Sequence, residues 1–147
     1  MEDITVPEEI EEGPAEVKVS PEAFHLYATH FYKCKQDFKS PDDWSPVPYF
    51  LLCRAIELEI KSKHLKGKSQ KEVKDEYGHR LSQAYNALDQ NEQVLTETEK
   101  AALAAASLIY NSKGFEYFNP YYAATGFSEY PDLRALDSIA KKLIDNA

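Results

Sequence analysis

The segment that decides the fold runs from Pro46 to Leu88 and reads PVPYFLLCRAIELEIKSKHLKGKSQKEVKDEYGHRLSQAYNAL. Its first half carries apolar side chains on two helical stripes, one of Tyr49, Cys53, Ile56 and Ile60 and one of Leu51, Leu58 and Leu65. Two apolar faces predict a helix that other helices cover over most of its surface. Arg54, Glu57 and Lys61 follow each other at spacings of three and four residues, so we expect them to pair along one side of this helix.

The rest of the chain favours the same class. With 147 residues and 43% hydrophobic content, the chain is long enough for one domain with a real core. It has five glycines and little alternation of apolar and polar residues, while Ala, Leu, Lys and Glu suit helices. We therefore predict an all-α domain.

Capping signals divide the chain into helices. Ser20-Pro21-Glu22 starts the first, Ser45-Pro46 starts the central helix, and the latter is expected to run to about Lys66, before Gly67. Ser69 with Glu72, and Thr96 with Glu99, are capping boxes for two more helices. Gly78 breaks the first of these, a further helix follows with Leu81, Tyr85 and Leu88, and a last helix starts near Pro131.

The cysteines and the apolar runs exclude several classes. Cys34 and Cys53 lie inside helical patterns, so we expect two small buried side chains in a reducing compartment and no disulfide scaffold. His25 and His30 are five residues apart and do not share a helix face for metal binding. No apolar run approaches the ~20 residues that span a bilayer. We expect a soluble, cytoplasmic protein without a metal, a cofactor or a membrane partner.

Charge is distributed unevenly. Residues 1–19 carry a net charge of −6 with few apolar side chains, which predicts a flexible acidic tail before a domain of residues 20–147. Residues 61–80 carry +4, which forms a candidate surface for an anion or a nucleic-acid backbone. Its candidate binding residues are Lys63, Lys66, Lys68, Lys71, Lys74 and Arg80. The alternative is an ordinary solvated surface, which the acidity of the whole chain favours.

Aromatic residues concentrate between the last two helices, in residues 115–130, which contain seven of them. One interpretation is that a long loop folds back and plugs the end of the bundle with its rings. Another is that bases of a single-stranded nucleic acid stack on the rings. A subunit interface is a third. The absence of Arg or Lys after Lys113 in this connector favours the first.

One polar group is a weak candidate for catalysis. Glu57, Lys61 and His79 would meet only if the short helix after Ser69 folds back onto the central helix, which the sequence leaves open. A carboxylate that orients an imidazole can serve acid-base chemistry or fix an anion-binding histidine. In the structural interpretation, which we favour, His79 pins the break at Gly78 and Glu57 satisfies Lys61 or Arg54.

These motifs resemble the HEPN superfamily, in particular its small stand-alone bacterial members. The resemblance rests on AIELEIKSKHLKGKS (residues 55–69), YGHRL (residues 77–81), KGFEY (residues 113–117) and the segment from Gly126 to Pro131. It implies a four- to five-helix up-and-down bundle with an aromatic-rich connector before the last helix, frequently a homodimer. It also implies a role in RNA cleavage, in toxin–antitoxin pairs or beside nucleotidyltransferases.

The chain departs from that family at the catalytic motif. Active HEPN ribonucleases carry an Arg followed four to six residues later by a His, and no Arg here precedes a His at that spacing. We therefore expect a non-catalytic interaction or RNA-associated module, which is a homodimer with an RNA or protein partner, whose acidic tail competes for the basic surface. The alternative is a divergent, metal-independent ribonuclease that uses Arg54 with His64, or Glu57 with His79.

Overall fold

Residues 20–147 are described by a computed structural model, and the predicted acidic tail of residues 1–19 lies outside the described residues. The predicted all-α fold is confirmed, because every regular element within residues 20–147 is a helix. The elements are α2 (Pro21–Asp37), α3 (Val47–His64), α4 (Gln70–Tyr77), α5 (Leu81–Asn86), the 3-10 turn η1 (Gln90–Glu92), α6 (Glu97–Asn111), α7 (Pro120–Ala124) and α8 (Leu133–Asp145).

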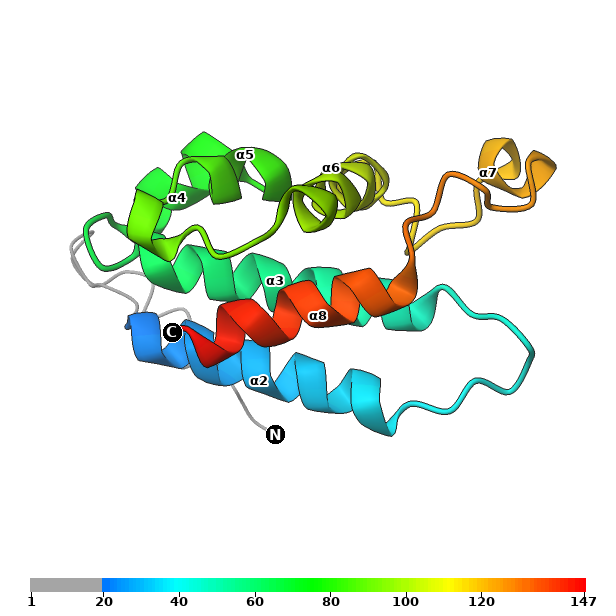
Figure 1. Cartoon of the computed structure of the whole chain (residues 1–147), viewed down its shortest axis with the longest axis horizontal. Coiled ribbons are helices and arrows are strands. Elements are labelled where there is room, and N and C mark those ends of the chain that lie inside the picture. The colour runs from blue at the N-terminus through cyan, green and yellow to red at the C-terminus, as the bar shows by residue number, and fades with distance from the viewer. Residues whose placement is uncertain (1–19) are drawn as a thin grey trace, which may run out of the picture.

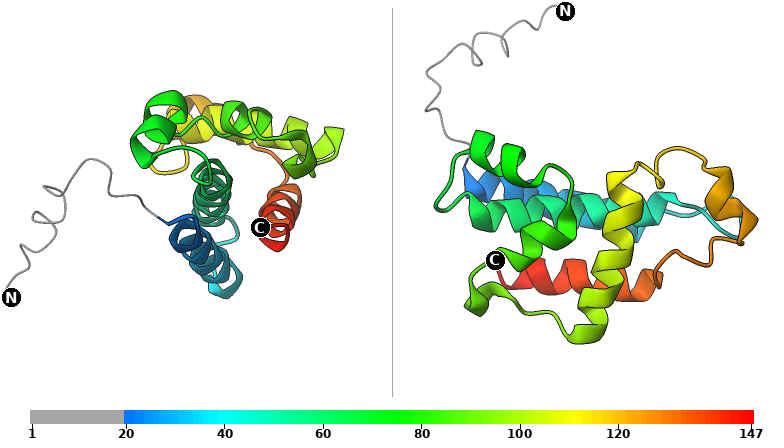
Figure 2. Two further views of the ribbon diagram at one scale, coloured as in Figure 1. Left: turned by 90° about the vertical axis from the view of Figure 1, so that its left-hand side faces the viewer. Right: turned by 90° about the horizontal axis from the view of Figure 1, so that it is seen from above.

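The helices form two layers around α3. Helices α2 and α3 run antiparallel, and α8 lies beside both and runs in the direction of α3 (Figure 1). Helices α4, α5 and α6 form a second layer over α3, and α6 crosses the long axis of the first layer (Figure 2). The predicted up-and-down arrangement is therefore present in α2 and α3, whereas α6 runs across the helices of the first layer.

Helix α3 is the central element, as its two apolar stripes predict. Cys53, Ile56 and Ile60 of the first stripe are fully buried, and α3 contacts α2, α5, α6 and α8. Leu52, which belongs to neither stripe, is also fully buried, whereas Leu51 of the second stripe is only partly buried. Burial of a large aliphatic side chain such as Leu52, Ile56 or Ile60 stabilises the fold by roughly 1.5–3 kcal/mol. Unpaired charges are costly in a buried position, so the acidic and basic side chains of α3 need partners there.

The predicted starts of α2, α4 and α6 are confirmed by their caps, whereas Pro46, the N-cap of α3, makes no side-chain cap hydrogen bond. The Ser20 side chain accepts hydrogen bonds from the backbone N–H groups of α2, and Ser69 and Thr96 each form a complete capping box. Gly78 ends α4 with φ +53°, a conformation that L side chains rarely adopt. The chain turns there, so His79 and α5 follow over α3.

Helix α2 differs from the sequence-based expectation at Cys34. This cysteine, expected to be buried, is exposed, and Tyr27 of the same helix is 59% exposed. Only Ala28 of α2 is fully buried, because α2 packs on the outside of the bundle, against α3 and α8. Cys53 is buried as predicted.

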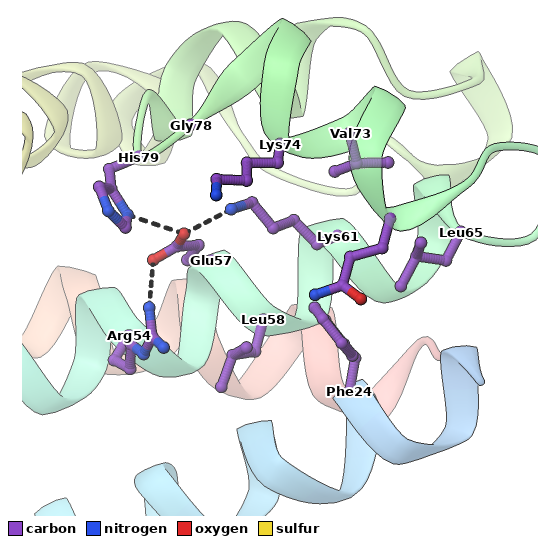
Figure 3. Close-up of a pocket in the computed structure, with 11 residues that line it drawn as sticks. Phe24, Arg54, Glu57, Leu58, Lys61, Leu65, Val73, Lys74, Gly78 and His79 are labelled. Carbon is purple, nitrogen blue, oxygen red and sulfur yellow. Dashed lines mark hydrogen bonds and ion pairs between the residues drawn. The ribbon is translucent and has the colours of Figure 1, made fainter. Parts of the chain in front are cut away.

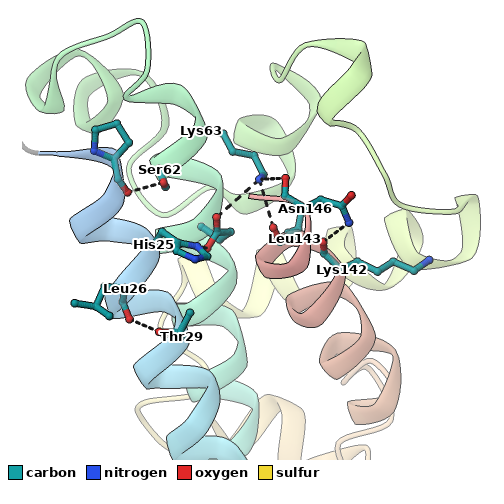
Figure 4. Close-up of polar contacts among 10 residues, drawn as sticks. His25, Leu26, Thr29, Ser62, Lys63, Lys142, Leu143 and Asn146 are labelled. Atoms are coloured by element: carbon teal, nitrogen blue, oxygen red, sulfur yellow. Dashed lines mark hydrogen bonds and ion pairs between the residues drawn. The ribbon is translucent and has the colours of Figure 1, made fainter.

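Lys63 joins α3 to the end of α8 (Figure 4). Its ammonium donates to the carbonyl oxygens of Leu143 at 3.3 Å and Asn146 at 3.2 Å, and lies 3.8 Å from Oε2 of Glu59. The last carbonyls of a helix have no partner within the helix, and a cation there also suits the helix dipole. Glu59 bonds in turn to Nδ1 of His25 at 2.7 Å, which ties α2 to the same point.

Part of the aromatic connector packs against the bundle, as the first interpretation predicts, and part of it is exposed. Phe115 is buried and stacks on Tyr49 with ring centroids 5.4 Å apart, and Tyr130 meets both rings edge-on, so part of the connector plugs the bundle end. Tyr117 and Phe118 are 68% and 77% exposed. The exposed rings precede α7, which projects away from the two layers (Figure 1).

Candidate functional site

Glu57 is the centre of a polar cluster on α3. Its carboxylate is buried and accepts hydrogen bonds from Nη1 of Arg54 at 3.1 Å, from Nζ of Lys61 at 2.7 Å, and from the hydroxyl of Tyr110. The predicted pairing of Arg54, Glu57 and Lys61 is therefore present. Burial raises the pKa of Glu57, but Lys61, Tyr110 and His79 outweigh burial and hold that pKa below its ordinary value.

His79 reaches the same carboxylate from the second layer. The turn at Gly78 folds the chain back, so Nδ1 of His79 lies 2.9 Å from Oε2 of Glu57. A carboxylate only accepts, so Nδ1 carries the donated proton and Nε2 is left available. The imidazole is 48% exposed, and its ring meets the Tyr110 ring edge-on. The structure thus brings together Glu57, Lys61 and His79.

A cleft of about 520 Å³ opens beside this cluster, between α2, α3 and α4 (Figure 3). Its basic lining comes from Arg54, Lys61, Lys74 and His79, Gln70 adds a neutral polar side chain, and Glu57 is the single acidic residue of the lining. Its apolar lining comes from Phe24, Leu58, Leu65 and Val73. Three permanent cations against one carboxylate make the cleft suitable for an anion, although the whole chain is acidic.

The six basic residues predicted from sequence do not form one surface. Lys63 is buried under α8 and its side chain is 1% exposed, so it is not a surface cation. Arg80 uses its guanidinium to hold the backbone carbonyls of Glu76 and Tyr77. Sequence spacing could not show this, because it depends on where α8 ends and how the chain turns after α4.

The remaining lysines divide into paired and unpaired groups. Lys66 lies 3.6 Å from Glu92, Lys68 donates to Glu76, and Lys71 donates to Asp75 at 2.7 Å. These pairs neutralise most of the predicted basic surface. Lys74 is exposed, has no acidic partner within residues 20–147, and extends from α4 toward the cleft (Figure 3).

Two smaller hollows continue from the cleft along the second layer. One, of about 230 Å³, shares Arg54 and His79 with the cleft and adds Tyr110, Lys113 and Glu116. The next, of about 250 Å³, shares Glu116 with that hollow. Its aromatic lining is Trp44, Phe115, Tyr117, Phe118, Phe127 and Tyr130. Shared lining residues therefore place the cationic cleft, the middle hollow and the aromatic hollow next to one another, with the acidic Glu116 between the last two.

Sequence reasoning missed Tyr110, and it paired Arg54 with Glu57 and Lys61 but considered it for catalysis only with His64. Tyr110 ends the apolar stripe of α6 and is buried, and burial raises the pKa of its hydroxyl well above the ordinary range, with Glu57 adding to the rise. A buried tyrosine needs a hydrogen-bond partner, which was the available signal. His64, the other histidine weighed for catalysis, bonds to the carbonyl of Ala84 at 2.8 Å and does not line the cleft.

Residues 20–147 contain no group of three or more His, Cys, Asp or Glu side chains arranged to hold a metal ion. In the same part of the chain, none of the helices has the length and apolar character needed to cross a bilayer. Comparison of the chain with models of protein families, with curated proteins and with solved structures gave no match.

Proposed function

We propose that this chain is a non-catalytic module that binds single-stranded RNA. The observation that supports the proposal is that the cationic cleft and the aromatic hollow of the connector both share lining residues with the hollow between them. Phosphate oxygens would meet Arg54, Lys61 and Lys74, and bases would stack on Tyr117 and Phe118. Proteins that bind single strands combine these two kinds of contact.

The chemistry of the cleft suits binding. Arg54 and Lys61 are already held in place by Glu57, so little side-chain entropy is lost when they meet a phosphate. Lys74 supplies a cation without a competing carboxylate within residues 20–147. An exposed imidazole with a free Nε2 adds a hydrogen-bonding group between the cleft and the next hollow.

Binding can be tested with fluorescence anisotropy of a labelled, single-stranded 12-mer RNA at about 50 mM salt. Lys74→Gln is expected to weaken binding by roughly threefold to tenfold, since one phosphate contact is lost. Lys71→Gln is the matched control, because Lys71 lies on the same helix, pairs with Asp75 and does not line the cleft. Equal affinity of the two variants would contradict the placement of phosphate in the cleft.

The aromatic end has its own test. Phe118→Ala is expected to cost about 1–3 kcal/mol of binding free energy if a base stacks on this ring. Tyr27→Ala is the control, because Tyr27 is similarly exposed but lies on α2 and lines none of the three hollows. A loss of the same size in both variants would show that the rings of the connector are not the stacking platform.

A divergent, metal-independent ribonuclease is the second candidate, favoured by the 2.9 Å contact between Glu57 and His79. His79 would take the proton of a ribose 2′-hydroxyl, whose oxygen would attack the adjacent phosphorus. Arg54 would stabilise the added charge, and the leaving 5′ oxygen would take a proton from solvent. Cleavage in the presence of chelator that His79→Ala abolishes would favour this candidate, and intact RNA would favour the module.

The HEPN-like relationship, a homodimer and a cytoplasmic location belong to this proposal as well. The first two rest on the resemblance of residues 55–69, 77–81 and 113–117 to that superfamily, and the cytoplasmic location rests on the two cysteines inside helical patterns. Light scattering during size exclusion is the direct test of the homodimer. Twice the mass of a single chain at micromolar concentration is expected, and a single-chain mass at all concentrations would remove the homodimer from the proposal.

A further inference from the structure

The middle hollow contains a carboxylate that phosphate binding does not explain. Glu116 lines both this hollow of about 230 Å³ and the aromatic hollow next to it. Its side chain is exposed and forms no ion pair with a cation of residues 20–147. A carboxylate repels phosphate and accepts hydrogen bonds from N–H groups, so its position suits a part of the ligand that donates.

The other side chains around Glu116 suit a flat heterocycle. Phe50 and Tyr110 line the hollow with rings whose centroids are 6.2 Å apart, and Arg54 and His79 lie on the side that it shares with the cleft. Its volume of about 230 Å³ lies under the roughly 300–1,000 Å³ of sites for drug-sized ligands. The hollow therefore suits a single base better than a whole nucleotide.

Lys113 supplies a donor next to this carboxylate. The backbone N–H of Glu116 donates to the carbonyl oxygen of Lys113 at 3.1 Å, so both side chains leave one turn, and both line the hollow. Lys113 has φ +65°, in the left-handed region that L side chains rarely adopt. No ion pair joins the two side chains within the described part of the chain, so the ammonium and the carboxylate are both available to a ligand.

We infer that the middle hollow selects guanine and that Glu116 is the residue that determines this specificity. The carboxylate accepts from N1–H and from the 2-amino group of the base, and the Lys113 ammonium donates to the adjacent O6. This inference rests on the proposed function, because it needs a strand in the hollow, and it adds the identity of one base.

The hydrogen-bonding edges of the other bases do not match Glu116. Guanine presents two adjacent donors on its Watson–Crick edge. Adenine and cytosine each place one amino group beside a ring nitrogen that only accepts, and uracil has a single N–H between two carbonyl groups. A carboxylate that meets any of these three bases therefore faces at least one acceptor.

Fluorescence anisotropy with three labelled 12-mer RNAs tests this selectivity. Each strand is uridine throughout except at one central position, which carries guanosine, inosine or uridine, and inosine is guanosine without the 2-amino group. At about 50 mM salt the guanosine strand should bind at least roughly fivefold more tightly than the uridine strand, because a bidentate contact discriminates by this factor or more. The inosine strand should lie between the two, since it keeps N1–H and O6.

Three variants separate the roles of the side chains. Glu116→Gln keeps the size of the side chain but replaces one acceptor with a donor, so it should bring the guanosine and inosine strands within about twofold of each other. Glu129→Gln is the matched control, because Glu129 lies in the same connector, accepts from the Tyr121 hydroxyl at 2.9 Å and lines none of the three hollows. Lys113→Asn, with a residue that tolerates positive φ, should weaken the guanosine and inosine strands by the same factor, because both bases carry O6.

The possible results distinguish this inference from the proposed function. Equal affinity of the wild type for all three strands would overturn the selection of guanine and leave single-strand binding intact. A preference for guanosine over inosine that survives Glu116→Gln would also overturn it, because another group would then read the 2-amino group. No binding of any strand at about 50 mM salt would overturn the proposed function and, with it, the inference.

Discussion

Glu57 is the residue on which the site depends, because a buried carboxylate is tolerated only while its partners remain. Arg54, Lys61 and Tyr110 all donate to it, and His79 contacts it across the layers. Glu57→Gln removes the charge and keeps the shape, so it leaves the 14% exposed Lys61 ammonium without a counter-charge. We expect a loss of about 3 kcal/mol in the free energy of unfolding, measured by urea denaturation.

The control for that change is Glu97→Gln, which neutralises a carboxylate that is 91% exposed. A surface ion pair of this kind contributes little to stability, so the free energy of unfolding should change by less than about 0.5 kcal/mol. Similar effects of the two changes would mean that Glu57 is stabilised no better than a solvated acid.

Glu99 gives a prediction about pH. Burial raises its pKa, but the ammonium of Lys142, the backbone N–H of Thr96 and the hydroxyl of Ser138 lower it to about 2. A carboxyl whose pKa falls on folding stabilises the fold above its unfolded pKa of roughly 4.3, and that contribution is lost as the pH falls toward 2. The free energy of unfolding of the wild type should exceed that of Glu99→Gln by about 1–2 kcal/mol at pH 6, and this difference should shrink below pH 4.

Thermal unfolding of both proteins between pH 2.5 and pH 7 measures that difference. Ser138→Ala, which removes only one neutral donor to Glu99, should lower stability less than Glu99→Gln and keep the same direction with pH. A gap between wild type and Glu99→Gln that is constant across the pH range would contradict a lowered pKa.

At the scale of elements, the turn after α4 positions the histidine of the site. Gly78 has φ +53°, so Gly78→Ala forces a side chain into a disfavoured backbone region and should cost about 2 kcal/mol. Gly67→Ala is the matched control: Gly67 has no positive φ and nothing within 4 Å of an added Cβ, so stability should stay within about 0.5 kcal/mol. Urea midpoints and the His79 ring signals measure both effects.

Local signals explain why the elements could be predicted and the site only in part. Helix starts are marked by Ser20, Ser69 and Thr96, whose side chains accept hydrogen bonds from backbone groups within three residues. Contacts this local can be predicted from the sequence. Lys63 looked like a surface cation because its true partners lie 80 and 83 residues away, at the end of α8. Glu57 and His79 could be named as candidates, but their contact depends on the turn at Gly78.

At the scale of the whole molecule, two opposing charges act on any nucleic acid. The chain has a net charge of −8, which repels a polyanion at long range, while the cleft offers three cations at short range. Long-range repulsion is screened within about 10 Å at 0.1 M salt, so a strand that reaches the cleft is held by local contacts. The proposed binding mode therefore involves a few phosphates and disfavours extended contact with a densely charged duplex.

This balance predicts a preference for single strands over duplex of the same sequence. A duplex carries a higher density of charge and keeps its bases paired, so its bases are not free to stack on Tyr117 and Phe118. We expect the single-stranded 12-mer to bind at least roughly tenfold more tightly than the duplex at about 100 mM salt, measured by anisotropy. Phe118→Ala should reduce that preference and Lys74→Gln should not, because the ring distinguishes paired from unpaired bases while the cation contacts phosphate in both. Equal affinity for the single strand and the duplex would mean that binding depends on charge alone and that the aromatic connector is not part of the binding surface.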